Sequence, residues 1–210
     1  MIKNIGKSKA SKVNITYDPY ILFQVEFCAS YDVIEEGKKI YPPLIKAHES
    51  IEKVYIKLLS QSGFLEIGTY TDCSNMHKGE LKDLTLIGYG SKDVIFNDSI
   101  YSGSIPDDEY IPIFDITECF KGFDKLNLSA IYNTLDIDID DYMELSVGQN
   151  YLSLRVYRKS DVAKKIRYQD VIFSFDANDI LINIDIINIS IDSMNIIQNY
   201  LFEKKVAKNK

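Results

Sequence analysis

Apolar and polar positions alternate along most of the chain, and this alternation predicts β-strands. The apolar runs are short, rich in Ile, Val, Tyr and Phe, and separated by turns that contain Gly, Asn, Asp or Ser. Strands at this spacing, with few helices between them, indicate an α+β fold built mostly of antiparallel sheet. The predicted strands are Tyr20–Cys28, Phe64–Thr71, Leu81–Tyr89, Val94–Asn97, Tyr110–Ile116, Leu126–Tyr132, Tyr142–Val147, Tyr151–Tyr157, Val171–Phe175 and Leu181–Ile189.

Two segments instead show apolar residues at helical spacing. The first predicts an amphipathic helix over about residues 43–61, which would begin after Pro42-Pro43 and stop before Gly63. Its apolar face would consist of Leu44, His48, Ile51, Tyr55 and Leu58. The second predicts a short helix from about Asp192 to Glu203, with Asp192 or Ser193 as its N-cap.

Three regions are expected along the chain. Residues 1–12 carry four lysines without an apolar run and predict a flexible basic tail. Residues 13–120 form an N-terminal α+β region, and residues 121–205 a C-terminal region that is mostly β. A single continuous domain over both regions is the alternative.

Composition places the chain among ordinary globular proteins, with 46% apolar and 26% charged residues. Three cysteines are too few for a disulfide scaffold. We expect their side chains to be buried as free thiols in a reducing compartment, and therefore predict a cytoplasmic protein. No run approaches the roughly 20 apolar residues of a membrane helix, and we expect no membrane association.

The distribution of charge is more informative than the net value of −7. Between Lys92 and Glu144 the chain has 13 acidic and three basic residues, which gives this acidic segment a charge of −10. Aromatic residues are interleaved with the acids, a composition that suits the docking of a basic partner. The candidate binding residues are Asp98, Tyr101, Asp107, Asp108, Glu109, Tyr110, Asp136, Asp138, Asp140 and Asp141.

The sequence contains only weak signals for metal binding, catalysis or nucleic-acid contact. The aspartates from Asp136 to Asp141 resemble the start of a calcium loop, but Asp141 and Val147 stand where that loop needs Gly and Glu. We therefore predict no metal, no cofactor and no catalytic residue. The run Arg155–Arg167 holds six basic residues and reads as the arm and tip of a hairpin, and nucleic-acid contact is not expected of so acidic a chain.

The region from Tyr142 to Ser190 resembles a small bacterial family of unknown function. The family pattern joins two strands by an Asp-x-x-Gly turn and continues to an acid and a closing serine, which Asp176, Asp185 and Ser190 match. Its apolar positions are matched by Ile184, Ile186 and Ile187. Asp179 and Asn183 replace the two family glycines, and Asp tolerates the positive φ that such a turn requires. The resemblance implies a hairpin and no activity.

The sequence therefore favours a non-enzymatic acidic protein that neutralises a basic partner, as a toxin-immunity protein or a phage-encoded inhibitor does. One alternative is a metal-dependent hydrolase or nuclease with clustered carboxylates. Its carboxylates would be Asp107, Asp108, Glu109, Asp136 and Asp138. The other alternative is an uncharacterised structural or regulatory bacterial domain.

Overall fold

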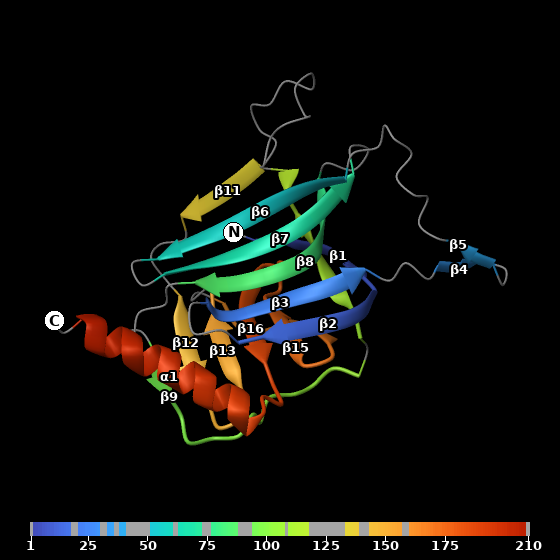
Figure 1. Cartoon of the computed structure of the whole chain (residues 1–210). Helices are drawn as coiled ribbons and strands as arrows, with labels where there is room; N and C mark the ends of the chain where they lie inside the picture. Colours follow the sequence, from blue (N-terminus) through green and yellow to red (C-terminus); the bar gives the residue numbers. More distant parts are fainter. Residues whose placement is uncertain are drawn as a thin grey trace.

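Two β-sheets packed face to face form most of the molecule (Figure 1). The structure, a computed structural model, describes residues 2–17, 21–29, 33–35, 38–40, 51–60, 63–72, 77–87, 94–107, 109–117, 133–138, 143–156 and 160–208. Buried side chains of both sheets belong to one hydrophobic cluster. Within it the Phe27 ring lies 6.1 Å from Phe173 and 6.2 Å from Tyr168, so aromatic contacts join the two layers.

The larger sheet has eight strands. Six follow the order β1-β10-β8-β7-β6-β11, while β3 pairs with both β8 and β2. All of its pairs are antiparallel except β11 with β6. Its strands are β1 (Asn4–Ser8), β2 (Ala10–Thr16), β3 (Ile21–Ala29), β6 (Ile51–Ser60), β7 (Gly63–Asp72), β8 (Lys78–Ile87), β10 (Ile111–Asp115) and β11 (Asn133–Asp138).

The smaller sheet has six strands in the order β14-β15-β16-β13-β12-β9. Only its β12–β9 pair is parallel among the described strands. Its strands are β9 (Val94–Phe96), β12 (Glu144–Val147), β13 (Leu152–Arg155), β14 (Lys164–Tyr168), β15 (Val171–Phe175) and β16 (Leu181–Ile186). A separate two-stranded ribbon joins β4 (Val33–Glu35) to β5 (Lys38–Ile40), and α1 (Ile191–Lys208) follows β16.

The mostly β character predicted from alternation is confirmed, but the helix predicted over 43–61 is wrong where the structure describes it. Residues 51–60 form β6, and residues 43–50 lie outside the described ranges. Ile56 and Leu58 are both buried, which is the two-residue period of a strand. Gly63 does not end a helix; it opens β7 and pairs with Ser60 in a tight hairpin.

The N-terminal residues are also placed differently from the expected tail. Residues 4–8 form β1, which pairs with β10, and residues 10–12 begin β2. Ile2 and Asn4 are both 3% exposed. The sequence signal was missed because the other side chains of β1 are half-buried or exposed, so no apolar alternation marks the strand.

The sheets do not divide the chain near residue 120. β9 comes from the first part of the chain but pairs with β12 in the smaller sheet, and β11 comes from the later part but pairs with β6 in the larger one. The run Arg155–Arg167 is likewise no hairpin, because β15 and β16 lie between β13 and β14. The predicted strand at Leu126–Tyr132 falls outside the described residues.

The chain ends in α1, which has 18 residues and is longer than the short helix expected. Its N-cap is Ser190, because the Ser193 N–H donates to Ser190 Oγ at 3.2 Å and the Met194 N–H to the Ser190 carbonyl at 2.9 Å. Neither Asp192 nor Ser193 takes that role. Across the described ranges, no helix combines the length and apolarity needed to cross a bilayer.

The turn between β15 and β16 has the predicted conformation at its last position. Asp179 adopts a φ of 63°, which Asp tolerates in place of glycine. Asp176 Oδ1 accepts from the N–H groups of Asn178 at 2.8 Å and Ile180 at 2.9 Å, which fixes the start of the turn.

Candidate functional site: a strap across the smaller sheet

Residues 97–107 and 109–110, here called the strap, cross the smaller sheet from one edge to the other (Figure 1). At the first edge, the Asn97 N–H donates to the Val147 carbonyl of β12 at 2.8 Å. At the second edge, the Tyr110 N–H donates to the Arg167 carbonyl of β14 at 2.6 Å. The strap therefore links β9, at one edge of this sheet, to β10 of the other sheet.

The face of the smaller sheet that points away from the core is polar. Two cross-strand rows can be followed from β14 to β12 through the pairing register. One row is Arg167, Ile172, Asp185, Ser153 and Ser146; the other is Lys165, Ser174, Asn183, Arg155 and Glu144.

Parts of this outer face are removed from solvent. Asp185 is 5% exposed and Ser174 only 2%, although both lie on the face opposite the core. A buried carboxylate must be hydrogen-bonded to be tolerated. The partners of Asp185 therefore show what the strap contributes to the fold.

Tyr101 anchors the first half of the strap on this polar face. Its Oη donates to Asp185 Oδ2 at 3.1 Å, and its N–H donates to Asn150 Oδ1 at 3.2 Å. Asn183 Nδ2 donates to the other Asp185 oxygen at 2.6 Å. Burial, followed by the charge of Asp185, raises the pKa of Tyr101, so the phenol remains a hydrogen-bond donor at neutral pH.

Two glycines make room for the aromatic contacts at this anchor. A Cβ at Gly103 would lie 2.5 Å from Tyr101 Oη, and one at Gly148 would overlap the Tyr151 ring. The rings of Tyr101 and Tyr151 meet edge to face with centroids 5.6 Å apart. These glycines are explained by the close approach of two rings to the backbone.

The second half of the strap is held by cations of β14. Lys165 Nζ donates to the Ser104 carbonyl at 3.1 Å, and Arg167 Nη1 donates to the Pro106 carbonyl at 3.4 Å. An open pocket of about 300 Å³ lies beside this half. Its lining residues are Lys7, Pro106, Asp107, Tyr110, Lys165 and Ile166.

The predicted acidic binding residues do not gather on one surface. Asp98, Asp107 and Glu109 are exposed on the strap, whereas Tyr101 and Tyr110 are half-buried. Asp136 and Asp138 belong to β11, at the edge of the other sheet and far from the strap in Figure 1. The remaining candidates, Asp108, Asp140 and Asp141, lie outside the described residues.

The carboxylates of the hydrolase alternative are divided in the same way. Asp107 and Glu109 lie on the strap, while Asp136 and Asp138 belong to the larger sheet. Within the described ranges, no three His, Cys, Asp or Glu side chains are grouped so that they could hold a metal ion.

Sequence reasoning missed the residues that hold the strap. The sequence predicts Asp185 only as the acid of the family resemblance, Lys7 as part of a flexible tail and Lys165 as part of a basic hairpin. A signal was present in the run Ile182–Ile186, where Asn183 and Asp185 interrupt an otherwise apolar strand. Polar residues at alternate positions of a strand predict a polar face, but this pattern is the same whether that face meets solvent or a covering segment.

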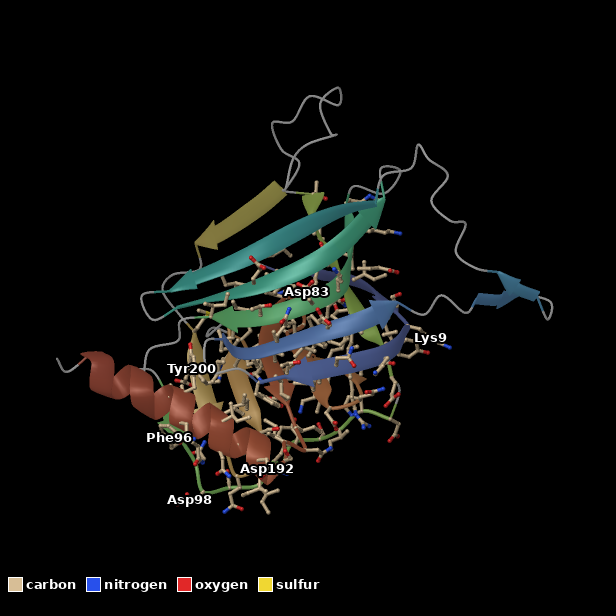
Figure 2. The ribbon with its side chains drawn as sticks, viewed as in Figure 1. Lys9, Asp83, Phe96, Asp98, Asp192 and Tyr200 are labelled. Carbon is tan, nitrogen blue, oxygen red and sulfur yellow. The ribbon has the colours of Figure 1, made fainter. Side chains whose placement is uncertain are left out.

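Exposed apolar side chains accompany the acidic residues near the first half of the strap. Phe96 is 50% exposed, Ile100 62% and Ile191 74%. The strap and the residues before α1 are both bonded to the turn between β12 and β13. The Tyr101 N–H donates to Asn150 Oδ1, and the Ile189 N–H donates to the Asn150 carbonyl. Figure 2 shows Phe96, Asp98 and Asp192 at the same end of the molecule, and we call these three residues, with their sequence neighbours Ile100 and Ile191, the acidic–apolar face.

No protein-family model matches the chain, and no curated protein does so either. The geometry of the strap and its two ends is therefore the basis for any functional argument.

Proposed function

We propose that this protein is a non-enzymatic binding protein that docks a basic protein partner through the acidic–apolar face. The observation that carries the proposal is that Phe96, Ile100 and Ile191 are exposed beside the exposed residues Asp98 and Asp192, at the end of the molecule where Figure 2 labels Phe96, Asp98 and Asp192. Exposed apolar side chains in a group, bordered by charge, are typical of protein interaction sites.

The charge of this face selects the kind of partner. Asp98 and Asp192 are exposed, and the whole chain carries a net charge of −7. Such a surface attracts basic proteins and speeds their association at low ionic strength. The apolar side chains would then provide contact area after the encounter.

The scaffold beneath the face suits a binding role because it is held at several points. The Gln149 N–H donates to the Ser99 carbonyl at 2.9 Å, and Gln149 Nε2 donates to the Asp98 carbonyl at 3.2 Å. Together with the Tyr101 anchor, these bonds order the strap before any partner arrives. A pre-ordered surface loses less conformational entropy on binding.

This proposal is narrower than the acidic surface expected from the sequence. It keeps Asp98 as a binding residue, uses Tyr101 only as an anchor of the strap, and leaves out Asp136 and Asp138, which belong to the other sheet. A toxin-immunity protein or a phage-encoded inhibitor would have this kind of partner. The resemblance of residues 142–190 to a bacterial family remains a prediction and adds no activity.

The test compares capture of basic proteins by the wild-type chain and two variants. The first variant, Ile100→Asp with Ile191→Asp, destroys the apolar part of the face. The control, Val162→Asp, changes a side chain that is 49% exposed elsewhere. We expect a basic protein to bind the wild type and the control but not the double variant, with an association rate that falls steeply between low and physiological ionic strength.

Two results would overturn the proposal. One is a partner that binds the double variant as tightly as it binds the wild type. The other is an association rate that salt does not change, since steering by exposed carboxylates is screened beyond a Debye length of about 8 Å at physiological ionic strength.

A further inference from the structure

We propose that the pocket beside the second half of the strap is a binding site for a small phosphate monoester. It lies at the other end of the strap from the acidic–apolar face, so the inference does not depend on the proposed protein partner. The cationic lining residues are Lys7 of β1 and Lys165 of β14, which two different sheets bring to one opening.

The ammonium groups of this pocket have neutral partners. Lys7 Nζ lies over the Tyr110 ring, 4.6 Å from its centroid, and Lys165 Nζ donates to a backbone carbonyl of the strap. Neither forms an ion pair with a carboxylate of the described residues. The adjacent Lys164 differs, because its Nζ lies 2.6 Å from Asp179 Oδ1.

Arg167 adds a third positive charge beside the pocket. Its Nε donates to the Gln169 carbonyl at 2.6 Å and its Nη1 to the Pro106 carbonyl at 3.4 Å. Backbone carbonyls satisfy these donors without cancelling the charge. Two ammonium groups that line the opening, with a guanidinium bonded to the lining residue Pro106, favour a dianion such as a phosphate monoester over a singly charged carboxylate.

The pocket's size and walls fit a small ligand. A volume of about 300 Å³ is at the lower end of known ligand pockets, which range from about 300 to 1,000 Å³. Pro106 and Ile166 also line the pocket, whose exposed lining is mainly polar. There is thus room for a phosphate and a group of about the size of a sugar.

One lining residue opposes the proposed ligand, and this makes the proposal testable. Asp107 also borders the pocket and is exposed. Its carboxylate would repel a bound phosphate. Removing that charge should strengthen binding, whereas removing Lys7 or Lys165 should weaken it, and only a ligand inside this pocket would respond in both directions.

The experiment titrates the folded, isotope-labelled chain with ribose 5-phosphate, inorganic phosphate and ribose at constant ionic strength. Amide resonances are followed by NMR. We expect saturable shifts at the amides of Lys165, Ile166 and Tyr110 with both phosphates, and none with ribose. Lys165→Gln and Lys7→Gln should each weaken binding about tenfold, and Asp107→Asn should tighten it about threefold or more.

A matched control is Lys78→Gln, which removes an exposed positive charge at the start of β8, outside the pocket lining. It should leave affinity unchanged within about twofold. The proposal is overturned if neither phosphate gives saturable shifts, or if Lys78→Gln weakens binding as much as Lys165→Gln. Binding of a single-stranded oligonucleotide without binding of either small phosphate would also overturn it.

Discussion

Both halves of the strap carry acidic residues, but they meet different surroundings. At the first half, the buried carboxylate of Asp185 accepts from Tyr101, and the exposed Asp98 has apolar neighbours. At the second half, Asp107 borders a pocket with Lys7 and Lys165. An exposed aspartate therefore has apolar neighbours at one end and cationic neighbours at the other, and a count of charges along the chain cannot distinguish these ends.

The halves also differ in how firmly they are held. In the first half, the Tyr101 hydroxyl of the strap donates to the buried carboxylate of Asp185. In the second half, the side chains of Lys165 and Arg167 donate to backbone carbonyls of the strap. Hydrogen bonds in buried surroundings contribute more to stability than those at the surface. We expect the first half to contribute most of the strap's stability, and the following changes test that difference.

Asp185→Ala should produce the largest loss of stability. It removes the acceptor of both Tyr101 Oη and Asn183 Nδ2 in a site that is 5% exposed. We expect the free energy of unfolding to fall by about 2–3 kcal/mol, measured by urea denaturation. Asp192→Ala, at an exposed position of α1, is the control and should change it by less than about 0.5 kcal/mol. Equal effects of the two changes would contradict the role of Asp185.

Tyr101→Phe compared with Lys165→Gln measures the two halves directly. The first change removes one hydrogen bond to a buried carboxylate and should cost about 1 kcal/mol of unfolding free energy. The second removes an exposed bond to the Ser104 carbonyl and should cost about 0.5 kcal/mol or less. If Lys165→Gln were the more costly change in the same denaturation experiment, the comparison of the halves would be wrong.

Gly103→Ala should destabilise the protein only while Tyr101 is present. The new Cβ would lie 2.5 Å from Tyr101 Oη, so the ring would have to leave Asp185. We expect the substitution to lower the free energy of unfolding by about 0.5–1 kcal/mol in the wild type. In a Tyr101→Ala background it should change that free energy by less than about 0.3 kcal/mol. A double-mutant cycle gives this coupling, and additive effects would show that the glycine serves another purpose.

The smallest expected effect concerns Lys164, the paired neighbour of Lys165. The hydrogen bond from Lys164 lowers the pKa of Asp179, so the folded protein binds this proton less tightly than the unfolded chain. The pair therefore stabilises the fold above the unfolded pKa of about 3.9, and this contribution disappears as the pH falls through the lower, folded pKa. Asp179→Asn should reduce the loss of thermal stability on acidification, and an unchanged pH profile would contradict it.

The fold could be predicted from sequence where burial alternates with a two-residue period. Strands such as β15 and β16 follow from their Ile and Phe residues, and the turn at Asp179 follows from the tolerance of Asp for positive φ. The segment 51–60 was misjudged because Ile51, Tyr55 and Leu58 also fit a helical spacing. Over ten residues the two periods overlap, and pairing with β7 and β11 decided the outcome.

The site was less predictable because it depends on contacts between distant parts of the chain. Tyr101 and Asp185 are 84 residues apart, and Lys7 meets Lys165 only because β1 and β14 reach the same opening. The acidic segment could be found from composition, but its division between two sheets follows from the pairing of β11 with β6. Local sequence patterns contain no information about such pairing.

The first residues of the chain lie between the two sheets, and this has a consequence for synthesis. The Ile2 carbonyl accepts from the Leu181 N–H, and the Asn4 N–H donates to the Asp179 carbonyl, both at 2.8 Å. These partners leave the ribosome almost 180 residues after the residues they bind. Residues 2–4 must therefore wait, with this edge unpaired, until residues 179–181 have been synthesised, and this is the stage at which a chaperone would protect the edge most.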